Sequence, residues 1–177
     1  MNETIETLKV LNKLQADGVI GKYAIGGAVG ALFYLEPMDT EDLDVFVSLG
    51  KQGAEIISLA PVYAYLKELG FDKFHKEGVI IAGWPVQFLP VADALDEEAL
   101  AQAVQTEVAG VPTAVLTAEH LVAKALQVGR GKDHLRILAF IESGRLDPAR
   151  LDGILQRHDF VAKMKQFEDK FGPDMRK

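Results

Sequence analysis

Two aspartates separated by a single residue, Asp42 and Asp44, lead into an apolar alternating segment. Side chains at positions i and i+2 of a strand share a face, whereas on a helix they diverge. If residues 43–48 form a strand, both carboxylates point the same way, while Leu43 and Val45 face the core. Two like charges this close repel each other unless a cation joins them, and a hard divalent ion such as Mg2+ is a natural partner. The spacing therefore indicates a metal site.

A glycine pair, Gly26 and Gly27, lies upstream between a predicted strand at 23–25 and a predicted helix at 28–35. Glycine lets backbone amides approach a ligand closely, and the positive end of the following helix favours an anion. Alone, the glycine pair is more typical of a tight turn, and an Asp-x-Asp pair also occurs at solvated strand starts. Together the two features complement each other, because amides suit phosphates and carboxylates suit the metal that bridges them.

The order of these motifs resembles the signature of the nucleotidyltransferase superfamily, which has a DNA polymerase β-like fold. The glycine pair and the run Thr40 to Asp44 carry the first part of this resemblance. The segment Leu116 to Leu126 and the run Gly129 to Asp133 are similar to later motifs of the AbiEii/AbiGii toxin-like branch, in which a helical lysine precedes an Arg-x-Lys-Asp element. The resemblance covers about residues 20 to 140.

The resemblance implies an enzyme that binds a nucleoside triphosphate with Mg2+ or Mn2+ and transfers a nucleoside monophosphate to a hydroxyl. It assigns catalysis to Asp42, Asp44 and Lys124, the metal to Asp42 and Asp44, and nucleotide binding to Gly26, Gly27, Thr40, Arg130, Lys132 and Asp133. The acceptor stays open between tRNA or another RNA, a protein hydroxyl and a small molecule. The branch also implies a toxin-antitoxin or phage-defence role, with a cognate antitoxin as partner.

One position departs from the family pattern. The family commonly places a third carboxylate on a later central strand, and in the best candidate strand, residues 84–89, Gln87 occupies that position. An amide is a poorer ligand for a hard metal than a carboxylate and cannot act as a general base. Glu77 and Asp93 are the nearest alternatives in the sequence, although Glu77 precedes a predicted turn and Asp93 follows the strand.

Three functions are therefore compared. The first is the nucleotidyltransferase, and the second, favoured by Gln87, is a catalytically reduced module that binds nucleotide without turnover. The third is a sugar-nucleotide transferase that uses Asp-x-Asp for manganese, but the chain is short for that fold. Two residues also have plain structural explanations, because Lys124 could reach solvent from a buried helix and Asp133 could cap one.

Composition limits the remaining possibilities. The chain of 177 residues is 49% hydrophobic, which suffices for one core or two small lobes. It has no apolar run that could span a bilayer and no export signal at its start, so we expect a cytoplasmic protein without a membrane partner. The absence of cysteine leaves oxygen and imidazole as metal ligands. A net charge of -7 disfavours non-specific binding to long nucleic acids, although Arg130, Lys132 and Arg136 form a local basic cluster.

The predicted fold is of the α/β (α+β) class. Residues 1–92 are expected to form a nucleotidyltransferase-like lobe with a mixed β-sheet flanked by helices, and residues 93–177 a mostly helical lobe packed against it. Further predicted elements are helices at 3–16, 54–69 and 96–105, a hairpin at 78–89 turning at Gly83-Trp84, extended pieces near Val108 and Ala114, and later helices bounded by Thr117, Gly129, Asp133 and Asp147-Pro148.

Overall fold

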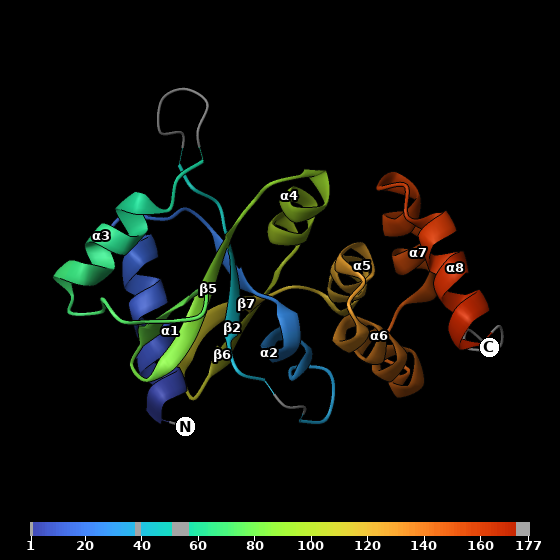
Figure 1. Ribbon diagram of the computed structural model, residues 1–177, viewed down its shortest axis with the longest axis horizontal. Coiled ribbons are helices and arrows are strands. Elements are labelled where there is room, and N and C mark those ends of the chain that lie inside the picture. The colour runs from blue at the N-terminus through green and yellow to red at the C-terminus, as the bar shows by residue number, and fades with distance from the viewer. Residues whose placement is uncertain (1, 38–39, 51–56, 173–177) are drawn as a thin grey trace.

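The computed structural model describes residues 2–37, 40–50 and 57–172 (Figure 1). Within these residues the strands are β1 (Tyr23–Ile25), β2 (Leu43–Val47), β3 (Phe74–His75), β4 (Gly78–Ile81), β5 (Trp84–Pro90), β6 (Val104–Val108) and β7 (Val111–Val115). The helices are α1 (Asn2–Ala16), α2 (Gly27–Ala31), α3 (Ala60–Glu68), α4 (Ala94–Ala101), α5 (Ala118–Val128), α6 (Gly131–Ser143), α7 (Pro148–Arg157) and α8 (Val161–Phe171). The predicted mixed α/β class is confirmed.

The strands form a mixed sheet in the order β3-β4-β5-β2-β1-β7-β6. Strand β1 runs antiparallel to β2 and parallel to β7, while β2 runs parallel to β5. In the β2–β5 register Asp44 lies opposite Gln87, so position 87 is the neighbour of the acidic pair on the adjacent strand. Strands β6 and β7, which follow residue 92, extend this same sheet. The predicted lobe boundary at residue 92 stays a prediction.

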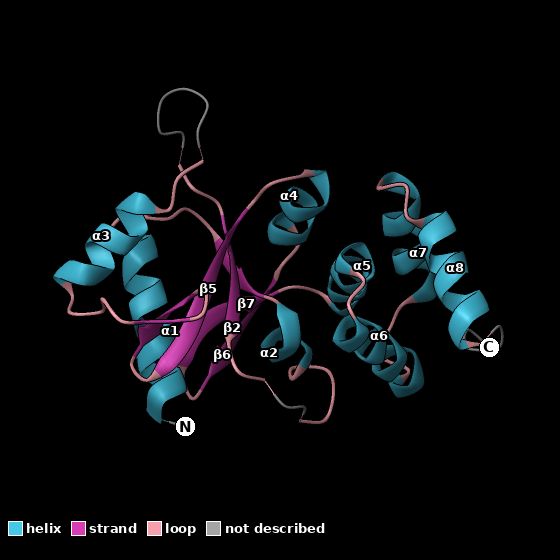
Figure 2. Ribbon diagram, in the orientation of Figure 1, coloured by secondary structure: helices cyan, strands magenta, loops and turns pink. Residues whose placement is uncertain are grey.

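Helices cover both faces of the sheet (Figure 2). Leu43, Val45 and Val47 are at most 1% exposed and pack with α1 and α3 in one hydrophobic cluster. Ala24 and Phe46 belong to a second cluster, which includes residues of α4 to α8. This separation follows from the two-residue period of a strand. It also places Asp44, which alternates with Val45, on the face that looks toward the C-terminal helices.

Several predicted elements differ in extent from the observed ones. The helix predicted at 54–69 begins at Ala60, with Pro61 in its first turn, where proline is well tolerated. Residues 54–56 of that prediction lie outside the described residues, and residues 57–59 are not helical. The helix predicted at 28–35 is the five-residue α2, and strand β3 was not predicted.

The hairpins are closer to prediction. The first turns at Ala82-Gly83, one residue earlier than expected, between β4 and β5. The extended pieces near Val108 and Ala114 are confirmed as a second hairpin, but the helix predicted at 96–105 is wrong at its end, because 104–108 is β6. Ala109 and Gly110 both have positive φ, as a type I′ hairpin turn requires, and this turn aligns β6 with β7.

A carboxylate on α4 joins that helix to α5 and α7. Glu98 Oε2 lies 2.7 Å from His158 Nε2, and Glu98 Oε1 lies 3.2 Å from His120 Nε2 and accepts a 2.6 Å hydrogen bond from Arg157 Nη2. The Arg157 hydrogen bond is the largest influence on this group, and despite partial burial the partners together lower the pKa of Glu98 to about 2. We refer to Glu98, His120, Arg157 and His158 as the Glu98 cluster.

No helix within the described ranges combines the length and the apolar character needed to cross a lipid bilayer.

The Glu98 cluster predicts a pH-dependent stability. Because the folded pKa of Glu98 is below its ordinary value of 4.5, its contribution is present above that pH and is lost as the pH falls toward 2. Glu98→Gln should therefore lower the free energy of unfolding by about 1–3 kcal/mol at pH 7, and by much less near pH 2. Urea denaturation at both pH values measures the difference, with the exposed neighbour Glu97→Gln as control. A loss that does not change with pH would contradict this account.

Candidate functional site

The glycine pair brings the end of β1 against β2. Gly26 N–H donates a 2.9 Å hydrogen bond to the backbone oxygen of Asp44. Gly27 has a φ of +57°, and a Cβ on it would overlap Asp44 Oδ2 and lie 2.8 Å from Asp44 Cγ. A Cβ on Gly26 would lie 2.7 Å from Phe46 Cδ2. Both glycines are thus required for close packing against the strand that carries the acidic pair, and their phosphate-binding role stays a prediction.

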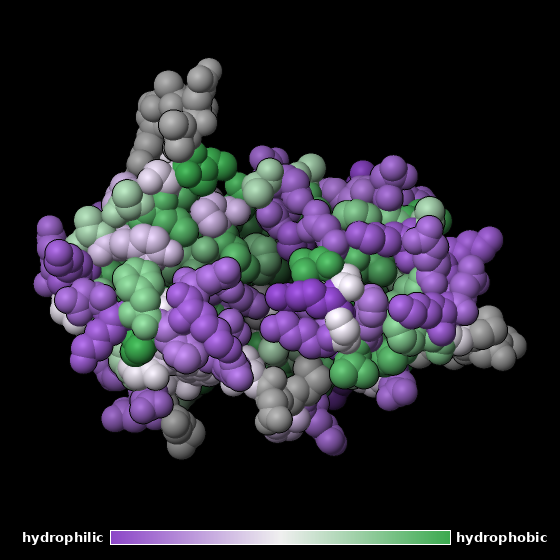
Figure 3. Space-filling view, in the orientation of Figure 1, coloured by the Kyte–Doolittle hydropathy of each residue, from purple (hydrophilic) through white to green (hydrophobic). Residues whose placement is uncertain are grey.

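Asp42 and Asp44 line two adjoining cavities that share five residues. These shared residues are Asp42, Asp44, Arg130, Lys132 and Arg136. The smaller cavity, of about 190 Å³, also has an apolar wall formed by Phe46, Leu89, Leu121, Ala125 and Val128. The larger cavity, of about 510 Å³, is completed by Ala28, Thr40, Glu41, Lys76 and Leu135. The space-filling view shows a hollow with hydrophobic atoms at its floor and hydrophilic side chains on both sides, between the sheet and the α5–α6 region (Figure 3).

The acidic pair is electrostatically strained in the absence of a cation. Burial and the neighbouring charge of Asp42 raise the pKa of Asp44 from 3.8 to about 6, although Arg136, Lys132 and Arg130 act in the opposite direction. A divalent cation between the two carboxylates would remove this repulsion, so the donor set fits Mg2+ or Mn2+. Over the described ranges no group of three or more carboxylate, histidine or cysteine side chains gathers to hold a metal. A cation here would complete its shell with water or substrate oxygens, as Mg2+ commonly does.

Gln87 occupies the place expected for a third carboxylate, beside Asp44. Its Nε2 donates a 2.7 Å hydrogen bond to Glu77 Oε2, which belongs to the turn between β3 and β4. Lys76, which precedes Glu77 in the chain, forms an ion pair with Glu41. Asp93, the other candidate carboxylate, is the N-cap of α4 and accepts a 2.8 Å hydrogen bond from Asp96 N–H. The structure thus brings Glu77, and not Asp93, next to Gln87.

Lys124 lines the smaller cavity but already has an anionic partner. Its ammonium lies 2.5 Å from Asp96 Oδ1, on α4, and 5.5 Å from the ring centroid of Phe46. Asp96 is 4% exposed, so the ion pair lies largely out of water. Lys124 is therefore positioned at the site, and an approach to substrate phosphates would compete with its bond to Asp96. The predicted catalytic role stays a prediction.

The start of α6 supplies the cations that face the acidic pair. Asp133, which was expected as the N-cap, lies instead at the third helical position and accepts hydrogen bonds from Arg130 N–H (3.1 Å) and Arg130 Nε (2.8 Å). Burial opposes its ionisation, but the bonds and charges of Arg130 and Arg136 together hold the pKa of Asp133 below its ordinary value. Asp133 is 1% exposed and forms ion pairs with both Arg130 and Arg136. Lys132 lines both cavities.

Arg136 is a site residue that the motif comparison missed. It lies one helical turn beyond Asp133, lines both cavities, and is only 8% exposed. In the sequence, Arg136 stood out only as a member of a local basic cluster with Arg130 and Lys132. That pattern does not tell whether its guanidinium is buried or exposed to water. Thr40 lines the larger cavity, where its hydroxyl donates a 2.9 Å hydrogen bond to the backbone oxygen of Asp42.

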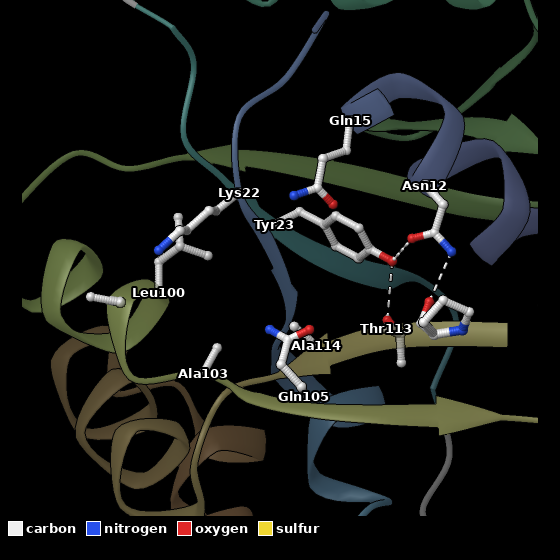
Figure 4. A pocket seen from close by; sticks show the side chains of 11 residues that line it. Asn12, Gln15, Lys22, Tyr23, Leu100, Ala103, Gln105, Thr113 and Ala114 are labelled. Carbon is white, nitrogen blue, oxygen red and sulfur yellow. Dashed lines mark hydrogen bonds between the residues drawn. The ribbon is translucent and has the colours of Figure 1, made fainter. Parts of the chain in front are cut away.

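A further cavity, of about 280 Å³, lies at the other end of β1 (Figure 4). Its polar groups largely satisfy one another, because the Tyr23 hydroxyl donates a 2.7 Å hydrogen bond to Asn12 Oδ1 and Asn12 Nδ2 donates one of 2.8 Å to Pro112 O. These bonds attach α1 to β1 and to β7. Lys22 is the charged residue among those lining this cavity. This cavity therefore lacks the paired carboxylates that distinguish the candidate site.

Comparisons with known proteins support the fold. No family model matches the chain, and no curated protein matches its sequence. Among solved structures, the chain is similar to an antigenic nucleotidyltransferase-like protein from Paracoccidioides brasiliensis, with a TM-score of 0.55, 14% identity and 93% of each chain covered. It is also similar to ANT(2″)-Ia, an antibiotic-resistance factor, with a TM-score of 0.52 and 17% identity over 96% of this chain and 98% of that one.

A crystal structure of ANT(2″)-Ia in complex with adenylyl-2″-tobramycin gives a TM-score of 0.50 and 15% identity, and covers 90% of this chain and 98% of that one. At these identities the likeness concerns the fold alone. The chain has a nucleotidyltransferase-like fold, as the motif order predicted, while its membership of the AbiEii/AbiGii branch stays a prediction.

The raised pKa of Asp44 predicts that this residue destabilises the metal-free protein. Protonated Asp44 is favoured in the fold, so its contribution to stability is present below about pH 4 and is lost as the pH rises through 6. Asp44→Asn should therefore raise the free energy of unfolding by about 1–3 kcal/mol at pH 8 in EDTA, and by little at pH 4. Urea denaturation provides the measurement, with exposed Asp72→Asn as control. An Asp44→Asn variant that is no more stable than the parent at pH 8 would disprove the assignment.

The contact between Gly27 and Asp44 predicts a large effect of one methyl group. Gly27→Ala would add both left-handed backbone strain and overlap with the Asp44 carboxylate. Gly110 has a φ of +80° but open space around a Cβ, so Gly110→Ala isolates the backbone cost, of about 1 kcal/mol. Gly27→Ala should cost about 1–3 kcal/mol more than this control. Equal losses in the two variants would show that the close contact is unimportant.

Proposed function

We propose that this protein is a nucleotidyltransferase that transfers a nucleoside monophosphate from a Mg2+- or Mn2+-bound nucleoside triphosphate to a hydroxyl acceptor. The observation that carries the proposal is the placement of Asp42 and Asp44, which line one cavity together with Gly27, Arg130, Lys132 and Arg136. Carboxylates for a metal and cations for phosphates are the groups that phosphoryl transfer needs. The nucleotidyltransferase-like neighbours support the same activity class.

In this reaction the acceptor oxygen forms a bond to the α-phosphorus, the bond from that phosphorus to the bridging oxygen breaks, and pyrophosphate leaves. Asp42 and Asp44 would hold the divalent ion, which would offset charge on the phosphates and orient them for in-line attack. Arg130 and Lys132 would bind the phosphates, and Gln87 would orient the acceptor through its amide. The proton of the acceptor hydroxyl passes to solvent or to a nearby carboxylate, since an amide cannot accept it.

The ordered motifs from Gly26 to Asp133 further support placing this enzyme in the AbiEii/AbiGii toxin-like branch. On that basis we propose a toxin-antitoxin or phage-defence role, with a cognate antitoxin as partner and a tRNA or protein hydroxyl as acceptor. ANT(2″)-Ia, by contrast, has been captured with an adenylylated aminoglycoside, which makes a small molecule the third acceptor class to test.

The alternative is a module that binds nucleotide without turnover. Gln87 favours it, because this side chain lies opposite Asp44 and uses its amide to bond Glu77. If the missing carboxylate limits turnover, the variant Gln87→Asp should transfer nucleotide faster than the parent protein.

Nucleotide binding through the acidic pair predicts a metal-dependent thermal shift. A nucleoside triphosphate with Mg2+ should raise the melting temperature by a few degrees, since a ligand at about 100 times its Kd adds about 2.7 kcal/mol. The double variant Asp42→Asn, Asp44→Asn should lose this shift, whereas Asp72→Asn should keep it. Each variant is compared with and without ligand, because Asp44→Asn changes the baseline. A shift that survives in the double variant would refute metal-mediated recognition.

Turnover is measured with each nucleoside triphosphate labelled at its α-phosphate, Mg2+ or Mn2+, and total cellular RNA, total protein or an aminoglycoside. The transferase predicts label on one acceptor class. A metal-dependent thermal shift without label on any of them would favour the binding module.

A further inference from the structure

Arg136 has hydrogen-bonding capacity that the protein itself leaves unused. Its side chain is 9% exposed, and the hydrogen bond from its Nη1 to Asp133 Oδ1 is a long one of 3.3 Å. Its Nε has no partner among the described residues. A buried cation with unsatisfied donors is costly unless an anion completes its shell. Because Arg136 lines both cavities, such an anion would lie within the candidate site.

Three cations lie close together around Arg136 and Asp133. Arg130 and Arg136 both form ion pairs with one carboxylate, that of Asp133. Lys132 lines the same two cavities. Asp133 is already occupied by the backbone and side chain of Arg130. We call these three cations the α6 basic cluster. Besides Asp133, the carboxylates that line the cavities within the described residues are Asp42, Asp44 and Glu41.

The position of the α6 basic cluster on its helix strengthens the case for an anion. Arg130 is the N-cap of α6 and Lys132 follows in the first turn. The N-terminus of a helix carries a partial positive charge, so cations are unfavourable there and an anion is favourable. A cation bound by Asp42 and Asp44 would cancel their charge and leave Asp133 and Glu41 as the carboxylates near the cluster. A multiply charged anion, which also supplies oxygens for Arg136, meets all of these requirements.

We propose that Arg136, together with Arg130 and Lys132, forms a polyphosphate subsite that binds the terminal phosphates of the nucleotide without requiring a metal. The subsite deepens the proposed function by separating two tasks, so that β2 holds the metal and α6 holds the polyphosphate. Arg136 contributes planar, paired N–H donors that match phosphate oxygens. Asp133 positions Arg130 and Arg136 and does not contact the anion. In the metal-free protein, Asp42 and Asp44 oppose anion binding by their charge.

The test measures binding of pyrophosphate to the full-length protein in EDTA by isothermal titration calorimetry. Arg136→Gln should weaken this binding about tenfold or more, since charge-assisted bonds to phosphate are lost. The double variant Asp42→Asn, Asp44→Asn should bind pyrophosphate at least about threefold more tightly than the parent, because two opposing charges are removed. Lys9→Gln, on α1, removes the same charge outside both cavities and should change the affinity by less than about twofold.

Three results would overturn the proposal. They are no pyrophosphate binding in EDTA, weaker binding in the double aspartate variant, and equal losses in Arg136→Gln and Lys9→Gln. Nucleoside triphosphate without metal should displace pyrophosphate, and failure to compete would show that the cluster serves a phosphate other than that of the nucleotide. Arg130→Gln, at an exposed side chain, repeats the test if Arg136→Gln does not fold by circular dichroism.

The experiment separates this proposal from the proposed function. If Mg-nucleotide binds but pyrophosphate in EDTA does not, the transferase proposal stands and the metal-independent subsite is wrong. If pyrophosphate binds as described but no metal-dependent nucleotide binding is found, the subsite stands and the transferase proposal fails.

Discussion

The repulsion between two neighbouring carboxylates is the constraint on which the rest of the site depends. Asp44 lies in β2 and Asp42 in the bend that immediately precedes it, and both side chains line the same two cavities. Burial makes this repulsion more expensive, as the raised pKa of Asp44 shows. The basic start of α6 reduces this repulsion, because Arg130, Lys132 and Arg136 line the same cavity and partly neutralise the pair. A site with this balance is prepared for a cation and an anion that arrive together.

Backbone geometry enforces that proximity. The glycines after β1 allow the chain to turn directly against β2, so the turn and the acidic pair cannot separate without loss of the sheet. The hydrophobic alternation of β2 anchors the other side of the strand, where Leu43, Val45 and Val47 pack with α1 and α3. The strained charges are therefore held by a core that does not depend on them. Natural sites commonly place strain in this way, where function requires it.

Local features of the site could be predicted from the sequence, because they depend on short-range periodicity. The proximity of Asp42 and Asp44 to one cavity, the glycine turn and the strand holding Gln87 all follow from spacing within a few residues. Features set by tertiary contacts were missed. Residues 104 and 105 were predicted to end a helix, and pairing with β7 makes them the start of β6. The bond between Lys124 and Asp96 and the burial of Arg136 likewise depend on how α4, α5 and α6 pack.

The arrangement also explains why a neutral residue at position 87 is compatible with a charged site. A carboxylate there would add a third negative charge beside Asp44, whose ionisation is already disfavoured. Gln87, which lines the smaller cavity, instead offers an amide, and that amide holds the carboxylate of Glu77 in a hydrogen bond. Glu77 is exposed, so its charge is screened by water and costs little. The carboxylate of Glu77 is thus linked to Asp44 through the intervening residue Gln87. The acidic pair itself carries only the negative charge that the α6 basic cluster can balance.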